Sequence, residues 1–100
     1  MIKHIVMWKL KDSAEAKSKE ENARLIKMKI EELKGKIDEI VDIEVGINIV
    51  DDPAAYDLVL YSVFKNRDDL DSYAKNPIHL EVVDMVKKLV VSRVVVDYKI

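Results

Sequence analysis

The chain contains no cysteine, which excludes disulfide bonds, thiolate metal sites and cysteine nucleophiles together. Only two glycines and two prolines occur in 100 residues, so collagen-like repeats and a long flexible linker are excluded as well. No apolar run reaches the length of a membrane-spanning helix, and the first residues lack the apolar core of a signal peptide. We therefore expect a cytoplasmic protein with no membrane partner.

Neither sign of charge predominates. The chain has 17 Lys and Arg against 19 Asp and Glu, a formal net charge of -2, and no long run of either sign. A nucleic-acid interface needs a basic stripe that neutralises phosphates, so we expect no nucleic-acid partner. What the chain does have is 49% hydrophobic residues, enough to pack a core. One domain over residues 1-100 is the simplest organisation.

Alternation of apolar residues predicts four strands. The clearest alternation runs over Val41–Ile49, where every second residue is Val or Ile. Helix signals lie between the strands: Asp12 and Ser13 can cap a first helix, and Ser18 with Glu21 forms a second capping box just inside it. The other expected strands are Ile2–Leu10, Tyr56–Phe64 and Ser92–Ile100.

The first helix carries an apolar stripe of Ile26, Ile30, Leu33 and Ile37, and Gly35 marks the region where it ends. Asn66 can cap a second helix that runs to about Lys75. The Asn76–Pro77 step then ends that helix and opens a third, because proline suits the first helical turn. The third helix has the apolar stripe Val82, Val83, Val86, Leu89 and Val90, with His79 one turn earlier.

The resulting order, βαβ followed by βααβ, predicts an α+β fold: a ferredoxin-like four-stranded antiparallel sheet with helices on one face. The other face of the sheet would expose aliphatic side chains, which we expect chiefly from the second strand, Val41–Ile49. Such an area is larger than a monomer usually leaves in water. Packing two sheets face to face would remove it, at about 25 cal/mol per Å² of apolar area. We therefore expect a homodimer.

A series of loose motifs runs along the whole chain in a fixed order: His4 with Trp8-Lys9, Gly46-Ile47-Asn48, Tyr56-Asp57-Leu58-Val59-Leu60, the Tyr73–His79 segment and Asp97-Tyr98. Together they resemble the stress-responsive α/β-barrel family, called Dabb. The resemblance implies a dimeric α/β barrel whose biochemical role is unassigned.

The resemblance extends to a plant polyketide cyclase of this fold family and implies a pocket between sheet and helices. Tyr73 and His79 then match catalytic positions, and the pocket wall would include His4, Val6, Trp8 and Val59. Three features depart from the cyclase. It has a histidine where this chain has Asp57, and a tyrosine in the first helix, where this chain has none. Trp8 also replaces a smaller aliphatic residue, which should shrink the cavity.

Each candidate has a chemical and a structural interpretation. His79 could act as a general base, because histidine titrates near neutral pH, or it could hydrogen-bond Tyr73 and fix the helix junction. Tyr73 could orient a substrate carbonyl or only satisfy His79. Asp57 would need a partner if buried, and His4 is a candidate. If His79 joined them, the three could form a two-histidine, one-carboxylate metal set, but the chain has no local ligand signature, so we expect no metal and no cofactor.

Three function classes remain open at this point. The first is a small homodimer that binds an apolar or aromatic ligand without turnover. The second is a cofactor-independent enzyme, such as a cyclase, a lyase or a monooxygenase, that uses Tyr73 and His79. The third is a purely structural oligomer. A cavity beside these two residues would separate the first two classes from the third.

Overall fold

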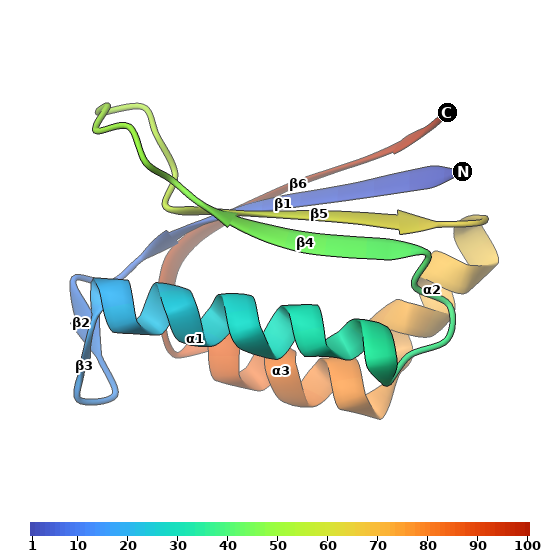
Figure 1. The fold of residues 1–100 in the computed structure, drawn as a ribbon, viewed down its shortest axis with the longest axis horizontal. Coiled ribbons are helices and arrows are strands. Elements are labelled where there is room, and N and C mark those ends of the chain that lie inside the picture. The colour runs from blue at the N-terminus through green and yellow to red at the C-terminus, as the bar shows by residue number, and fades with distance from the viewer.

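A four-stranded sheet and a layer of helices on one of its faces make up the fold, in a computed structural model that describes residues 1–100 (Figure 1). The elements are β1 (Ile2–Leu10), β2 (Ser13–Ala14), β3 (Lys17–Ser18), α1 (Lys19–Glu31), the 3-10 helix η1 (Glu32–Gly35), β4 (Asp42–Ile47), β5 (Leu58–Phe64), α2 (Arg67–Lys75), α3 (Pro77–Lys87) and β6 (Val90–Lys99).

The main sheet has the strand order β4-β5-β1-β6, and every neighbouring pair is antiparallel. The first and last strands of the chain are therefore neighbours, and the two termini lie side by side (Figure 1), where the Ile100 N–H donates to the Met1 carbonyl at 3.0 Å. This arrangement confirms the predicted α+β, ferredoxin-like sheet with helices on one face. None of the helices is both long and apolar enough to cross a membrane.

The first helix begins later than its first capping signal suggested. Asp12 and Ser13 do not cap it, because a short β2–β3 hairpin occupies this segment. Ser18 is the cap instead: its Oγ accepts from the Glu21 N–H, and the Glu21 carboxylate accepts from the Ser18 N–H, both at 3.2 Å. The later capping box therefore decides the start of α1, since it satisfies two free N–H groups.

Most other helix boundaries agree with the sequence prediction, but α3 ends at Lys87, so Leu89 of the predicted stripe lies beyond it and Val90 begins β6. The 3-10 turn after α1 ends at Gly35. Asn66 caps α2 by accepting from the Asp69 N–H at 2.9 Å. Asn76 then ends α2 and caps α3, accepting from the Ile78 N–H at 2.9 Å, with Pro77 in the first turn of α3. This shared cap fixes the angle between the helices that carry Tyr73 and His79.

The expectation that the aliphatic side chains of the second strand face away from the helices was wrong. Ile43 and Val45 of β4 are buried on the helix side against α1, and Asp42, Glu44 and Gly46 alternate with them on the other side. A two-residue period assigns alternate residues to the same face of a strand, but it does not say which face is buried. Here α1 covers the aliphatic group.

The apolar part of the uncovered face comes instead from β1, β5 and β6. The strand register places Met7 between Val59 and Val94, and Ile5 between Tyr61 and Val96. Met7, Val94, Val96 and Tyr98 are 40 to 55% exposed. We call this surface the open sheet face; its apolar members are Ile5, Met7, Val59, Val94, Val96 and Tyr98.

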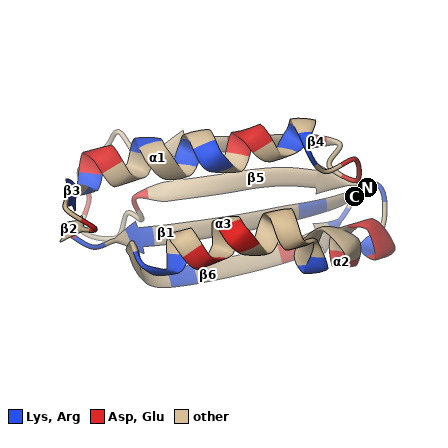
Figure 2. Ribbon diagram, turned by 90° about the horizontal axis from the view of Figure 1, so that it is seen from below, with Lys and Arg blue, Asp and Glu red and all other residues tan.

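Charge is distributed differently on the helix layer. Both acidic and basic residues occur along α1 and α3 (Figure 2), and Lys27 pairs with Glu31 one turn later at 2.7 Å. Pairs at this spacing stabilise a solvated helix surface modestly. The helix layer is therefore the polar surface of the molecule, in contrast to the open sheet face.

Candidate ligand-binding site

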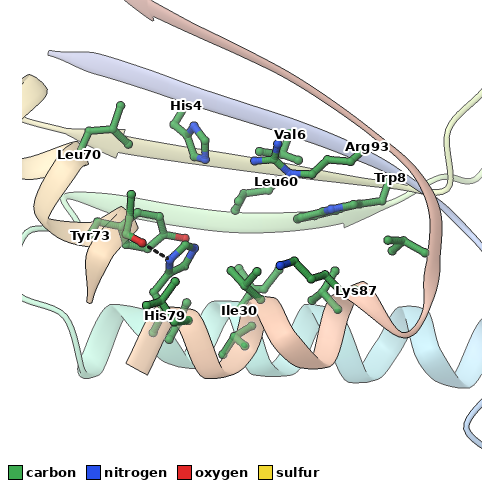
Figure 3. A pocket seen from close by; sticks show the side chains of 17 residues that line it. His4, Val6, Trp8, Ile30, Leu60, Leu70, Tyr73, His79, Lys87 and Arg93 are labelled. Carbon is green, nitrogen blue, oxygen red and sulfur yellow. Dashed lines mark hydrogen bonds between the residues drawn. The ribbon is translucent and has the colours of Figure 1, made fainter. Parts of the chain in front are cut away.

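A cavity of about 400 Å³ lies between the sheet and the helices, and 13 of the 17 residues that line it are hydrophobic. This size is within the range of small-molecule pockets, roughly 300–1,000 Å³. Strand β1 contributes His4, Val6 and Trp8 from its helix side, and α2 and α3 contribute Tyr73 and His79 (Figure 3). Five of the seven candidate site residues therefore meet in one place.

Local sequence explains why these side chains meet. His4, Val6 and Trp8 are alternate residues of β1 and so point to the same face of the sheet. His79 precedes Val82, Val83 and Val86 by three, four and seven positions, which places all four on one side of α3. Because α3 contacts α1 and α2, its apolar side is held over the sheet, but the packing leaves the cavity between them.

Tyr73 and His79 are in contact through their rings. The ring centroids are 4.2 Å apart and the planes are inclined by 39°. The expected hydrogen bond between the two side chains is not formed; His79 Nδ1 instead lies 3.2 Å from the Ala74 carbonyl oxygen. A carbonyl oxygen only accepts, so Nδ1 carries the proton in this contact and Nε2 keeps a lone pair.

Burial changes the acid–base properties of both groups. It raises the pKa of Tyr73 to about 12, so the phenol stays protonated and can donate a hydrogen bond. Burial also lowers the pKa of His79 below its ordinary value of 6.5, although the bond to Ala74 opposes this change. At pH 7 the pair is therefore a neutral imidazole beside a neutral phenol.

The lowered pKa of His79 predicts a pH dependence of stability. In the unfolded chain His79 takes up a proton as the pH falls through about 6.5, whereas in the folded protein it does so only at lower pH. Stability should therefore decrease as the pH falls below about 6.5, and His79→Gln should reduce this slope. The check is the melting temperature of both proteins between about pH 5 and pH 8. Equal slopes would show that His79 titrates as it does in the unfolded chain.

His4 has a different partner from the one expected. Its Nδ1 lies 2.5 Å from Asp97 Oδ1, because the β1–β6 register places His4 directly opposite Asp97. The pairing with Asp57 was wrong: on β5 the residue opposite His4 is Ser62, and Asp57 lies near the other end of β1. The ring of His4 also approaches that of Tyr73, with centroids 6.3 Å apart.

Asp57 satisfies its carboxylate outside the cavity. Its Oδ2 accepts from the Leu10 N–H at 2.7 Å and lies 3.8 Å from Lys19 Nζ. His4, Asp57 and His79 therefore do not converge into the metal set considered from the sequence. The carboxylate instead secures the connection between β1 and β5, where the Asp57 N–H also donates to the Trp8 carbonyl at 2.8 Å.

Val59 does not line the cavity either, because its register partner is Met7 and both belong to the open sheet face. Two cationic residues of the cavity wall, Lys87 and Arg93, were missed from the sequence. The signal for Lys87 was its place four residues after Val83, on the apolar side of α3. The signal for Arg93 was its alternation with Val95 and Asp97, on the helix side of β6.

The family model of the stress-responsive A/B barrel domain, Dabb, matches residues 2–100. The chain belongs to the Dabb family. Among solved structures, a dimeric protein of unknown function with a ferredoxin-like fold from Bacteroides fragilis is 37% identical to this Dabb protein, with a TM-score of 0.85 over 99% of this chain and 95% of that chain. The family predicted by resemblance is confirmed.

Two more distant structures share the fold of this Dabb protein. A Dabb family protein from Mesorhizobium loti is 21% identical, with a TM-score of 0.74 over 99% of this chain and 95% of that chain. A hydroxynitrile lyase from Passiflora edulis is 18% identical, with a TM-score of 0.78 over 99% of this chain and 92% of that chain. No curated protein matches the sequence.

Proposed function

We propose that this Dabb protein is a homodimer that binds a small apolar or aromatic molecule in the cavity of each protomer. The observation that carries the proposal is the cavity itself, a space of about 400 Å³ with mostly apolar walls. Three groups able to hydrogen-bond, from His4, Tyr73 and His79, gather at one end of it (Figure 3). Apolar walls with few convergent polar groups are typical of ligand pockets.

Two surfaces support the homodimer. The open sheet face exposes aliphatic side chains from adjacent strands, a surface that a second sheet could cover. The β4–β5 loop stands clear of the body (Figure 1) and carries Ile49 and Val50, which are 94% and 63% exposed. The relatives from Bacteroides fragilis and Thermobifida fusca are both described as dimeric, which favours the same assembly here.

Trp8 allows a direct test of ligand binding. It is the only tryptophan of the chain and it lines the cavity, so its fluorescence should change saturably when an apolar molecule enters. Val86→Phe should fill the cavity and abolish that change, because Val86 is a buried wall residue. Ile78→Phe is the matched control, since it adds the same ring on α3 at a position outside the cavity wall. Native mass spectrometry of the purified protein would identify a ligand that is retained.

A cofactor-independent enzyme, either a lyase or cyclase or a monooxygenase, is the second candidate. A neutral His79 with a free Nε2 could take a proton from a substrate carbon or hydroxyl, and the Tyr73 phenol could donate to the oxygen on which charge develops. His79→Gln should then abolish turnover of a substrate found by screening while leaving ligand affinity and melting temperature near the wild-type values. Loss of stability without loss of turnover would leave His79 a structural residue.

A further inference from the structure

Two cations project into the apolar cavity from opposite walls. Arg93 extends from β6 on the sheet side and Lys87 from α3, and both end groups point into the space between the two layers (Figure 3). Neither residue forms an ion pair, although six ion pairs occur elsewhere in the chain. Both side chains are therefore free to bind an anion, as most lysines and arginines of the chain are, but these two also line the cavity.

The cavity wall differs in charge from the rest of the chain. Acidic residues outnumber basic ones in the sequence, 19 to 17, yet no Asp or Glu lines the cavity. Arg93 and Lys87 are both exposed to solvent, so water screens their charges in part, and the adjoining apolar walls make that screening weaker than it is in open water. A planar guanidinium also matches a carboxylate with two parallel hydrogen bonds.

We propose that the ligand of this cavity is an organic acid with a single carboxylate, which Arg93 binds from the sheet side while Lys87 faces it from α3. This inference rests on the proposed ligand-binding function and names the ligand class. The apolar body of the acid would lie against Val6, Trp8 and Val86, and its far end would reach Tyr73 and His79. Lys87 is in the last turn of α3, where the partial negative charge of the helix end stabilises its own positive charge.

Matched pairs of acid and amide isolate the carboxylate. Octanoic acid with octanamide and cinnamic acid with cinnamamide differ within each pair only in the charged group. Calorimetry on the full chain should show each acid binding about tenfold or more tightly than its amide, because a charge-assisted pair is strong in an apolar site. Arg93→Met should weaken acid binding by about tenfold and leave amide binding unchanged.

Lys88→Met is the control for the loss of one positive charge, because Lys88 follows Lys87 directly but does not line the cavity. It should bind both acids as the wild type does. Amides that bind as tightly as acids, with no effect of Arg93→Met, would overturn the anion inference but leave an apolar pocket in place. Acid binding that survives Val86→Phe would overturn it too, because the acid would then bind elsewhere. Absence of binding by all four compounds would overturn both the inference and the proposed function.

Discussion

Replacing Met7 by aspartate is expected to convert the protein in solution from a dimer, near twice 11.5 kDa, into a monomer. Met7 lies in β1 on the open sheet face, between Val59 and Val94, and is 40% exposed in the single chain. A carboxylate there remains solvated in the monomer but would be buried without a partner in the dimer. That desolvation costs several kcal/mol, roughly a thousandfold or more in the dissociation constant. Light scattering at micromolar concentration measures the change.

Met28→Asp provides the matched control for this experiment. Met28 is 48% exposed, close to the value for Met7, but it lies on α1 in the helix layer. The same substitution there should leave the dimer intact and only lower helix stability by a few tenths of a kcal/mol. Dimers that persist in Met7→Asp, or a wild type that is already monomeric, would contradict the open sheet face as the interface.

The local elements could be predicted because their signals act over a few residues. Alternation in β1 grouped His4, Val6 and Trp8, and the Asn76–Pro77 step located the junction between α2 and α3. Both features depend on backbone geometry near the residue itself, which tertiary contacts did not override. Local signals therefore placed three residues of β1 on one face and put Tyr73 near His79, whereas the prediction of a pocket around them came from the family resemblance.

Features that depend on distant parts of the chain were not predicted correctly. The partner of His4 is Asp97, 93 residues away, and only the register between β1 and β6 brings them together. The buried face of β4 depends on where α1 packs, which a period of two does not specify. Arg93 was overlooked because an arginine at an alternating position of a strand usually faces solvent, and the cavity it enters exists only in three dimensions.

Sequence and structure give different information about the site. Residue types and local spacing identified Tyr73 and His79 as a unit, but the geometry changed their relation from a hydrogen bond to a ring contact. That change matters for chemistry, because it leaves both Nε2 of His79 and the Tyr73 hydroxyl unused by each other. Because the two groups do not hydrogen-bond each other, both can hydrogen-bond a ligand in the cavity.

Trp8→Ala is expected to have the largest effect on the folded protein. Trp8 is 6% exposed and belongs to the main core, so truncation should lower the free energy of unfolding by about 3–5 kcal/mol. Because Trp8 also lines the cavity, the same truncation should enlarge the cavity toward β1. Acids with a bulkier ring, such as naphthoic acid, should then gain affinity relative to cinnamic acid. Urea denaturation measures the first effect and calorimetry the second.

Ile26→Ala separates loss of core packing from gain of cavity space. Ile26 is fully buried on α1 but does not line the cavity, and its truncation should cost about 2–5 kcal/mol. It should therefore destabilise the protein without changing the preference between the two acids. Trp8→Leu covers the case in which the alanine variant does not fold, since it keeps part of the buried side chain while still widening the cavity. An unchanged preference in both Trp8 variants would mean that the ligand does not contact this wall.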